Sequence, residues 1–256
     1  SRFDGSVWTT YTHTDGLPAD ATYALALAPD GTIWAGTEGG LARFDGTWTS
    51  YTTADGLPDA LVWSVGVDAQ GIVWASTHGG GVARYDPQRD AWTTYIADFP
   101  YPNARVLAVA PDGAPWLHIG YDNVYRFDGE AWQIAYESGG GQWVCDIAFA
   151  VDGLPWIATC GGYRARGAGL AHRDGDVWYY VTSVEGLPDT AVHAVAISPT
   201  GVIAAGTDRG IGVYQDGRWR TLRSGPTLRA ATTVATTADA AWFGFGNTDF
   251  QAPGGG

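Results

Sequence analysis

Lysine and methionine are absent from this 256-residue sequence, so all 14 basic residues are arginines. Without lysine, the chain cannot form a Schiff base or build a phosphate-binding P-loop, because both need that side chain. The net charge of −13 argues against binding to nucleic acid or anionic membrane surfaces, which depends on basic patches. The missing initiator methionine leads us to expect a mature or excised chain.

Long apolar runs and charged residues are also scarce. No apolar stretch approaches the ~18 residues of a membrane-spanning helix, so we expect no membrane insertion. Charged residues make up 16% of the chain, which is low against a typical fraction of ~25%. Apolar residues make up 45%, and the 37 glycines and 13 prolines supply many turns. This composition is typical of a turn-rich all-β protein with a substantial core.

A repeat is the dominant feature that the sequence does contain. The segment GTIWAGTEGGLARFDGTWTSYT (31–52) recurs in variant form from Gly71 and from Gly153. Its G-x-x-W position recurs at Trp34, Trp74, Trp116, Trp156, a degenerate Ala204 and Trp242, in steps of 40, 42, 40, 48 and 38 residues. These steps match the size of a four-stranded propeller blade. A second series, DG-x-W-x-x-Y, runs through Trp8, Trp48, Trp92, Trp132, Trp178 and Trp219. Six units predict an all-β, six-bladed β-propeller.

The two tryptophan series are out of phase, and this offset predicts how the ring closes. The first unit contains only its outer end and the last unit only its inner half. Joined tail to head, they reproduce the pattern found between Gly79 and Tyr95. We therefore predict a single domain over residues 1–256, in which segments 1–12 and 229–256 share one blade and leave no open sheet edge.

Each blade is predicted to contain four short strands. In the first, β-prone runs at 23–28, 32–37, 41–44 and 47–51 are separated by glycine-containing turns. DGLP or EGLP segments at Asp15, Asp55 and Glu185 then lead into the next inner strand, whereas the DGLP at Asp152 belongs to a hairpin turn. The repeated tryptophans, the threonine of W-A-G-T, and Arg43, Arg84 and Arg126 are explained by packing.

The combined pattern DGLP…G-x-(I/V)-W-x-(G/S)-T-x-G-G-(L/V)-x-R-(F/Y)-D resembles the two-component-regulator propeller repeat over nearly the whole chain. That resemblance implies an extracytoplasmic sensor module, often one that recognises carbohydrates, and hence an extracellular or periplasmic location. A weaker likeness, through G-x-(I/V)-W alone, is to propellers of the streptogramin-lyase type.

Positions that depart from the repeat are the informative ones for function. The first residue of the inner strand varies, as Tyr23, Trp63, Arg105, Cys145, His193 and the degenerate Ala231, whereas the strand body is uniformly apolar. A two-residue turn would place the first five of these residues opposite Glu38, His78, Gly120, Cys160 and Asp208, respectively. A longer turn with a bulge would shift that register by one residue.

These strand starts and the variable loops 98–103, 137–143, 161–169 and 247–256 are predicted to lie at one end of the ring. We predict a binding site there for a small polar ligand or glycan, because aromatic and polar groups are mixed. Its candidate residues are Tyr23, Glu38, Trp63, His78, Arg105, His118, Tyr121, Trp143, His193 and Asp208. The alternative is that these side chains merely plug the channel. We expect a monomer.

Three further chemistries remain open. His193 with Asp208 is a candidate oriented base for a lyase or hydrolase, although no nucleophile motif accompanies it. Histidines and carboxylates near the axis lack short metal-ligand spacing, so we predict no metal and no cofactor. Arg164 and Arg166 are candidates for an anion clamp or are only solvated.

Besides a ligand-binding module and an enzyme, a third class of function stays open. It is an interaction scaffold, or an excised or engineered propeller without a ligand.

With only two cysteines, Cys145 and Cys160, we expect no zinc site, and a disulfide is favoured. The equivalent positions of other repeats hold unrelated residues, so packing does not require cysteine there. The alternative is a pair of free cysteines that act as small buried apolar residues.

Overall fold

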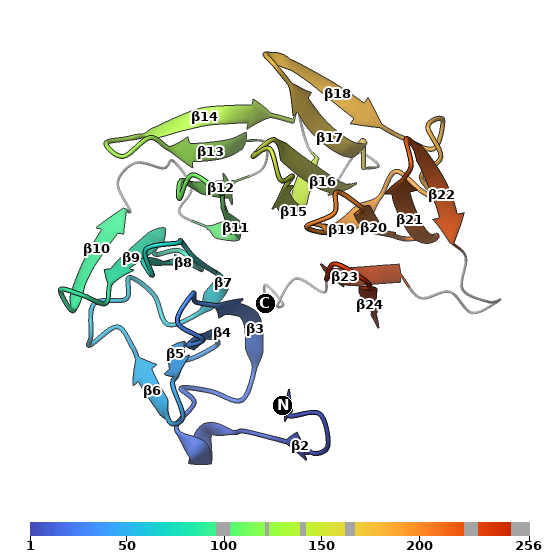
Figure 1. Ribbon diagram of the computed structural model, residues 1–256. Coiled ribbons are helices and arrows are strands. Elements are labelled where there is room, and N and C mark those ends of the chain that lie inside the picture. Colours follow the sequence, from blue (N-terminus) through green and yellow to red (C-terminus); the bar gives the residue numbers. More distant parts are fainter. Residues whose placement is uncertain (96–102, 121–122, 139–141, 162–166, 223–229, 247–256) are drawn as a thin grey trace, which may run out of the picture. The chain divides into compact units, whose positions relative to one another are not determined.

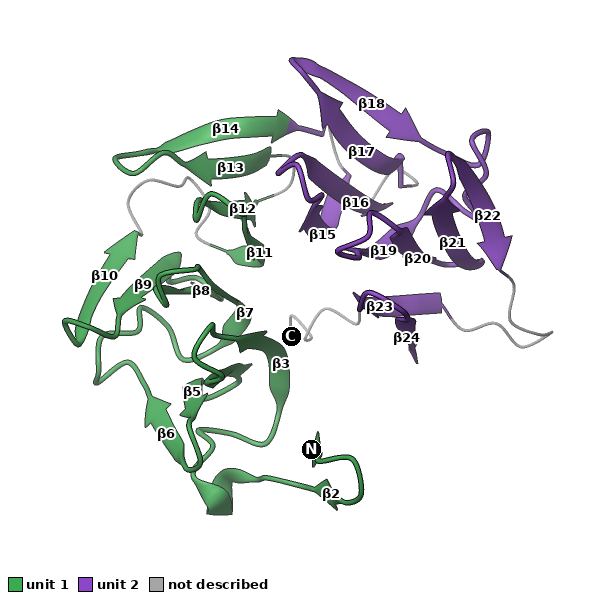
Figure 2. Ribbon diagram, in the orientation of Figure 1, with its two compact units in different colours: residues 1–136 green, residues 137–256 purple. Residues whose placement is uncertain are grey.

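The computed structural model describes residues 1–95, 103–120, 123–138, 142–161, 167–222 and 230–246. The chain divides into two compact units, Ser1–Tyr136 and Glu137–Gly256 (Figure 2). The prediction of a single domain, with one blade shared between its ends, stays a prediction. Within each unit the described secondary structure is β-strand, apart from one short 3-10 helix near the N-terminus.

Unit 1 contains a short hairpin followed by three four-stranded antiparallel sheets (Figure 1). Its elements are β1 (Arg2–Phe3), β2 (Trp8–Thr9), η1 (His13–Asp15), β3 (Thr22–Leu27), β4 (Ile33–Thr37), β5 (Gly40–Phe44), β6 (Trp48–Tyr51), β7 (Val62–Val67), β8 (Val73–Thr77), β9 (Val82–Asp86), β10 (Ala91–Tyr95), β11 (Ala104–Val109), β12 (Pro115–Ile119), β13 (Asn123–Phe127) and β14 (Trp132–Glu137). The sheets are β3–β6, β7–β10 and β11–β14, each with its strands in sequence order.

Unit 2 contains two four-stranded sheets, β15–β18 and β19–β22, and a two-stranded sheet of β23 and β24. Its strands are β15 (Trp143–Phe149), β16 (Pro155–Gly161), β17 (Gly169–Asp174), β18 (Val177–Val181), β19 (Val192–Ile197), β20 (Ile203–Thr207), β21 (Gly210–Gln215), β22 (Arg218–Leu222), β23 (Ala230–Thr236) and β24 (Ala241–Gly246). Most repeat units therefore fold as the four-stranded sheets that the sequence predicts.

The predicted packing role of the repeat residues is seen in side-chain contacts. Trp34 is 2% exposed and stacks on Tyr51. The Thr37 hydroxyl donates to the carbonyl of Gly40 at 2.8 Å, and equivalent bonds form in later sheets. The threonine bonds hold the second strand to the turn that follows it in every four-stranded sheet except β11–β14, where Ile119 takes the place of the threonine, so the repeated residues are accounted for by structure.

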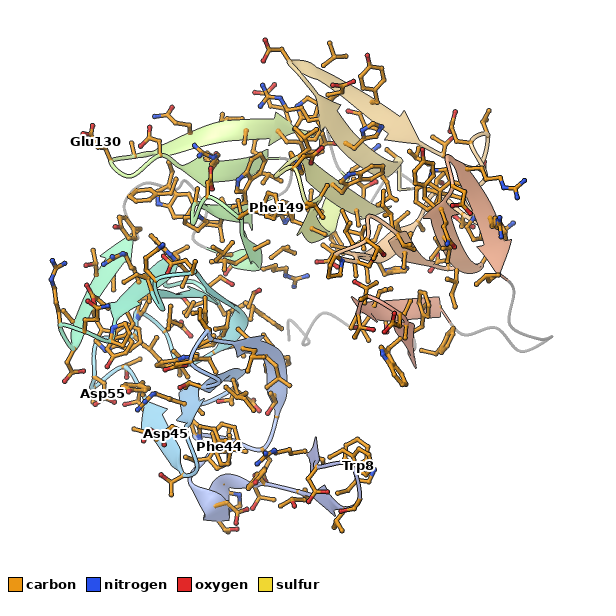
Figure 3. The ribbon with its side chains drawn as sticks, viewed as in Figure 1. Trp8, Phe44, Asp45, Asp55, Glu130 and Phe149 are labelled. Atoms are coloured by element: carbon orange, nitrogen blue, oxygen red, sulfur yellow. A yellow bond between two sulfur atoms is a disulfide. The ribbon has the colours of Figure 1, made fainter. Side chains whose placement is uncertain are left out.

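The DGLP segments form capped connections between sheets. The amide and hydroxyl of Thr52 both donate to the Asp55 carboxylate, at 2.8 and 3.0 Å. Figure 3 labels Asp55 in the connection that follows β6. Gly56 adopts φ +115°, and a Cβ there would lie 3.1 Å from Trp92, so the glycine lets the connection pass against that ring. The DGLP at Asp152 instead forms the β15–β16 turn, where Leu154 N donates to the Asp152 carboxylate.

The hairpin register differs by one residue from the predicted one. The Ala28 amide donates to the Thr32 carbonyl at 2.8 Å, so the turn contains three residues and not two. Leu25 consequently pairs with Ala35, where the two-residue turn placed Gly36. The turn glycine, Gly31, has φ +88°, as three-residue hairpin loops require. The predicted exact opposition of Tyr23 with Glu38, and of the equivalent pairs, is therefore wrong.

The strand starts are β-bulges. Thr22 pairs with Thr37 and Ala24 with Gly36, which leaves Tyr23 as the extra residue. The same shift isolates Trp63, Arg105, Cys145 and His193 in the following inner strands. In β23 the extra residue is Thr232, one position beyond the predicted Ala231. Because bulges re-aim side chains, the variable residues leave the regular pattern of their sheets.

Neighbouring sheets within unit 1 are joined by Ser64 of β7. Its hydroxyl donates to the Leu107 carbonyl at 3.1 Å and accepts from the Leu107 amide at 3.3 Å. Leu107 pairs with Leu117 across its own sheet and turns these two backbone groups toward β7. The Ser64 hydroxyl thereby provides a partner for both the amide and the carbonyl of Leu107, which point away from β12.

Replacing Ser64 with alanine should destabilise the protein by about 1–3 kcal/mol, because it leaves a half-buried amide and carbonyl without their partner. The measurement is urea unfolding of Ser64→Ala. The control is Ser183→Ala, whose serine is exposed and should change the free energy of unfolding by less than about 0.5 kcal/mol. Equal stabilities of the two variants would contradict this role for Ser64.

Candidate functional site

Three bulge residues of unit 1 form a continuous row of side chains, here called the aromatic row: Tyr23, Trp63 and Arg105. The Tyr23 and Trp63 rings lie 5.0 Å apart at 60°. The Arg105 guanidinium carbon stands 5.5 Å from the Trp63 ring centroid, within the range of a cation–π contact. The row therefore connects the starts of β3, β7 and β11.

The surroundings of the aromatic row are exposed and polar. His78 packs its ring 6.0 Å from that of Trp63, and both His78 and Glu38 are exposed. Tyr23 is 46% exposed and Arg105 is also exposed, whereas Trp63 is half-buried between them. Trp63 thus supports two accessible groups, an aromatic ring and a guanidinium, that suit contacts to a polar ligand.

A second cluster lies at the strand starts of unit 2. Cys145 and Cys160 form a disulfide with a Cα–Cα distance of 5.8 Å, which confirms the predicted pairing. His193 Nε2 lies 2.7 Å from Asp208 Oδ1, so these two side chains meet despite the shifted backbone register. A ring nitrogen of His193 lies within 4.8 Å of both sulfur atoms. Trp143 is half-buried, and its carbonyl oxygen lies 3.9 Å from the Cys160 sulfur.

Asp146, the residue after Cys145 on β15, is a buried acid that sequence reasoning missed. Its carboxylate accepts hydrogen bonds from the amides of Val195 and Ile147, each at 2.9 Å. It joins β15 to β19 as Ser64 joins β7 to β11. Burial raises the pKa of Asp146 to about 7, although the two amide donors act in the opposite direction. The sequence did contain a sign of this residue, because the equivalent positions of other repeats hold no acid. They are Ala24, Ser64, Val106 and Ala194.

The remaining predicted site residues fall in different environments. His118, on β12, is 2% exposed and pairs with Val106 and Val124 inside its sheet. Tyr121, Arg164 and Arg166 lie outside the described residues, as do most residues of the variable loops. A ligand-binding role for any of these positions stays a prediction.

A cavity of about 310 Å³ in unit 1 lies at the ends of β3 and β7, whereas the aromatic row lies at the starts of these strands. It is lined by residues of the β3–β4 and β7–β8 turns and of neighbouring segments, including Trp34, Arg43, Gln70 and Pro87. Arg43 is ion-paired with Asp45 at 3.0 Å, and Figure 3 labels Phe44 and Asp45 at the end of β5. Trp34 and Arg43 in this lining are repeat residues that packing explains. They give no sign of a specialised site of the kind seen at the strand starts.

His172 of β17 is stacked between two aromatic rings. Its ring lies 4.4 Å from that of Trp156 and 5.6 Å from that of Tyr179, nearly parallel to both. Burial lowers the pKa of His172, and the nearby Asp174 acts in the opposite direction. Folding therefore favours the neutral imidazole.

Acidification should consequently remove stability through His172. The unfolded chain takes up a proton near pH 6.5, whereas the folded chain does so only at lower pH. The contribution is complete above the unfolded pKa and is lost as the pH falls toward the folded pKa, by at most about 1.4 kcal/mol per pH unit. The measurement is the difference in unfolding free energy between wild type and His172→Gln from pH 7 to pH 5. A difference that does not change with pH would contradict the expectation.

No family model matches this sequence, and no curated protein matches it. Solved structures do match. Virginiamycin B lyase from Staphylococcus aureus aligns with a TM-score of 0.71 and 13% identity over 87% of this chain and 77% of that one. The extracellular domain of a hybrid two-component system from B. thetaiotaomicron aligns with a TM-score of 0.65 and 14% identity over 93% of this chain. This chain spans only 40% of that structure.

A gluconolactonase from Xanthomonas campestris aligns with a TM-score of 0.59 and 19% identity over 93% of this chain and 91% of that one. Together with the sheet topology, these likenesses establish the fold predicted from the repeats, an all-β six-bladed β-propeller. Sensor domains and enzymes both occur among the similar structures, so the fold alone does not choose between them. Within the described part of the chain, no helix has the length and apolar character to cross a membrane.

Proposed function

We propose that this chain is a sensor-type propeller that binds a small polar ligand, with a glycan as the first candidate, at the starts of its inner strands. The aromatic row is the observation that carries the proposal. Three successive inner strands replace the repeat pattern with Tyr23, Trp63 and Arg105, and these side chains contact one another. Packing of the repeat does not require any of the three residue types at that position.

The chemistry of the row suits a sugar that bears a charged or strongly polar substituent. Tyr23 offers an exposed ring to the apolar face of a sugar, and Arg105 offers a planar set of donors to a carboxylate or phosphate. Trp63 holds both groups in position. We also propose an extracellular or periplasmic location, supported by the disulfide and by the likeness to an extracellular sensor domain.

The test is a screen of neutral and uronate-containing oligosaccharides and of common metabolites against the wild type, repeated on Trp63→Ala and Arg105→Ala. Each substitution should weaken binding roughly thirtyfold, the equivalent of about 2 kcal/mol at an interface hot spot. Tyr180→Ala and Arg218→Ala replace exposed residues of the outer strands β18 and β22 and should bind as the wild type does.

Two results would sink this proposal. If Trp63→Ala and Arg105→Ala bind a discovered ligand as tightly as the wild type, the site lies elsewhere. If both variants unfold, the aromatic row is a structural plug. If the wild type binds no compound in the screen but binds another protein, the interaction-scaffold alternative is favoured.

A lyase or hydrolase is the second candidate, and the His193–Asp208 contact favours it. At 2.7 Å the carboxylate is placed to orient the imidazole, as a general base requires. A catalytically inactive histidine-to-alanine variant of virginiamycin B lyase is among the similar structures. An enzyme of this type predicts that His193→Ala abolishes turnover of a discovered substrate and leaves its binding largely intact. If the wild type turns over no ligand that it binds, and His193→Ala no longer binds that ligand, the enzyme hypothesis is excluded.

A further inference from the structure

The disulfide and His193 together suggest a function that neither feature has alone. Cys145 lies on β15, Cys160 on β16 and His193 on β19, and their potential ligand atoms all fall within 4.8 Å of one another. All three residues are half-buried. We propose that reduction of the disulfide converts this cluster into a metal site, in which two thiolates and one imidazole bind a single zinc-like divalent ion.

The ligand set determines which metal is expected. Two cysteine thiolates and a histidine are a ligand combination that zinc uses, with a fourth position left for water or a further group. Hard ions such as magnesium and calcium prefer oxygen ligands and are not expected here. The site is therefore selective through its sulfur atoms, and these are available as thiolates only after reduction.

Asp208 supplies the second feature of such a site. Metal-bound histidines usually pair their other ring nitrogen with a carboxylate or carbonyl, which fixes the tautomer and the ring orientation. Here His193 Nε2 already contacts Asp208 Oδ1 at 2.7 Å, which leaves Nδ1 for the ion. The His193 side chain is only 12% exposed, so its orientation is constrained by the protein.

A phosphine and one water molecule together reduce the disulfide to two thiols. The phosphine takes the oxygen of one water molecule to become a phosphine oxide. The two electrons that it loses and the two protons of that water convert the S–S bond into two thiols. Binding of a divalent ion then releases the two thiol protons, and the ion binds two thiolates and neutral His193. Reoxidation by an added disulfide such as oxidised glutathione, which takes up the two electrons and two protons and leaves as two thiols, expels the ion, because the re-formed disulfide is a poor ligand. Metal binding and the disulfide therefore exclude each other.

The repeat gives an independent reason to assign a role to these residues. The bulge positions equivalent to Cys145 and His193 hold Tyr23, Trp63 and Arg105 in unit 1. A lone disulfide needs neither a histidine beside it nor a carboxylate behind that histidine. The four side chains together match a metal site and its supporting carboxylate.

The experiment uses the full chain with cobalt(II) as the probe. Oxidised protein is reduced with a phosphine, freed of it by anaerobic gel filtration and titrated with Co²⁺ and then Zn²⁺. Reduced protein should bind one Co²⁺ per chain with sulfur-to-cobalt charge-transfer absorption, and Zn²⁺ should displace it. Oxidised protein should show no such absorption. Asp208→Asn should bind about 10–100-fold more weakly, and His193→Ala at least as weakly. His13→Ala, which removes an exposed histidine of unit 1 that is likewise paired with an aspartate, should match the wild type.

Several outcomes would overturn the inference. One is reduced, folded protein that binds no stoichiometric Co²⁺. Another is a His193→Ala variant with the wild-type affinity and spectrum, since the thiolates would then act without the imidazole. If reduction unfolds the chain, circular dichroism decides, because the ion should restore the folded spectrum. Failure to restore it at any Zn²⁺ concentration rejects the site.

Discussion

A chain that lacks residues 1–12 is expected to aggregate or to lose cooperative unfolding. The sequence predicts that this segment supplies the outer strands of the blade begun by segment 229–256. In the structure β1 and β2 form one two-stranded sheet, and β23 and β24 form another, so each has only half of a blade's strands. Without the N-terminal strands, the last blade would keep an exposed edge, and exposed edges pair with other chains.

The measurements are thermal unfolding and size-exclusion chromatography of the deletion variant. Its control must separate strand loss from the loss of other contacts, because Tyr11 packs on Phe44 and Trp48 and Thr12 caps η1. A Tyr11→Ala/Thr12→Ala double variant removes those contacts and retains β1 and β2. It should stay monomeric with a modestly lowered melting temperature. A monomeric deletion variant that melts like the wild type would disprove blade sharing.

Removal of the disulfide should produce the second large effect. In metal-free buffer, the Cys145→Ser/Cys160→Ser variant is expected to lose about 3 kcal/mol, because the sulfurs close a loop with a sequence separation of 15 residues. For a chain of this size that corresponds to a melting temperature lower by roughly 6–12 °C. The fold should survive, since the repeated tryptophans and threonines remain in place.

Two controls make the disulfide result specific. Reduced wild-type protein without metal should melt near the temperature of the double variant. Oxidised wild-type protein, unfolded without reductant, should contain no titratable thiol. Two free thiols in that sample, or an unchanged melting temperature in the double variant, would contradict the expected contribution of the bond.

The sequence by itself determined the architecture of this protein, because a propeller repeats one local unit. Trp34 stacks on Tyr51 of its own sheet and meets Tyr85 of the next sheet edge-on. Thr37 bonds to Gly40 of its own sheet, and Gly56 contacts Trp92 of the next outer strand. Contacts of this kind recur with the repeat and can be recognised from spacing. The disulfide and the His193–Asp208 pair were also predictable, since both join the first two strands of one hairpin.

Only the tertiary structure decided the register and the chemistry of the strand starts. The three-residue turn after Ala28 shifts the ladder by one residue, and the bulge at Tyr23 shifts it by one more residue at the far end. Turn length and bulge depend on backbone geometry that an Asp-Gly pair does not specify. The Trp63–Arg105 stack, the Asp146–Val195 bond and the approach of His193 to the cysteines all cross between neighbouring sheets. Such contacts depend on how two sheets pack, which no repeat period encodes.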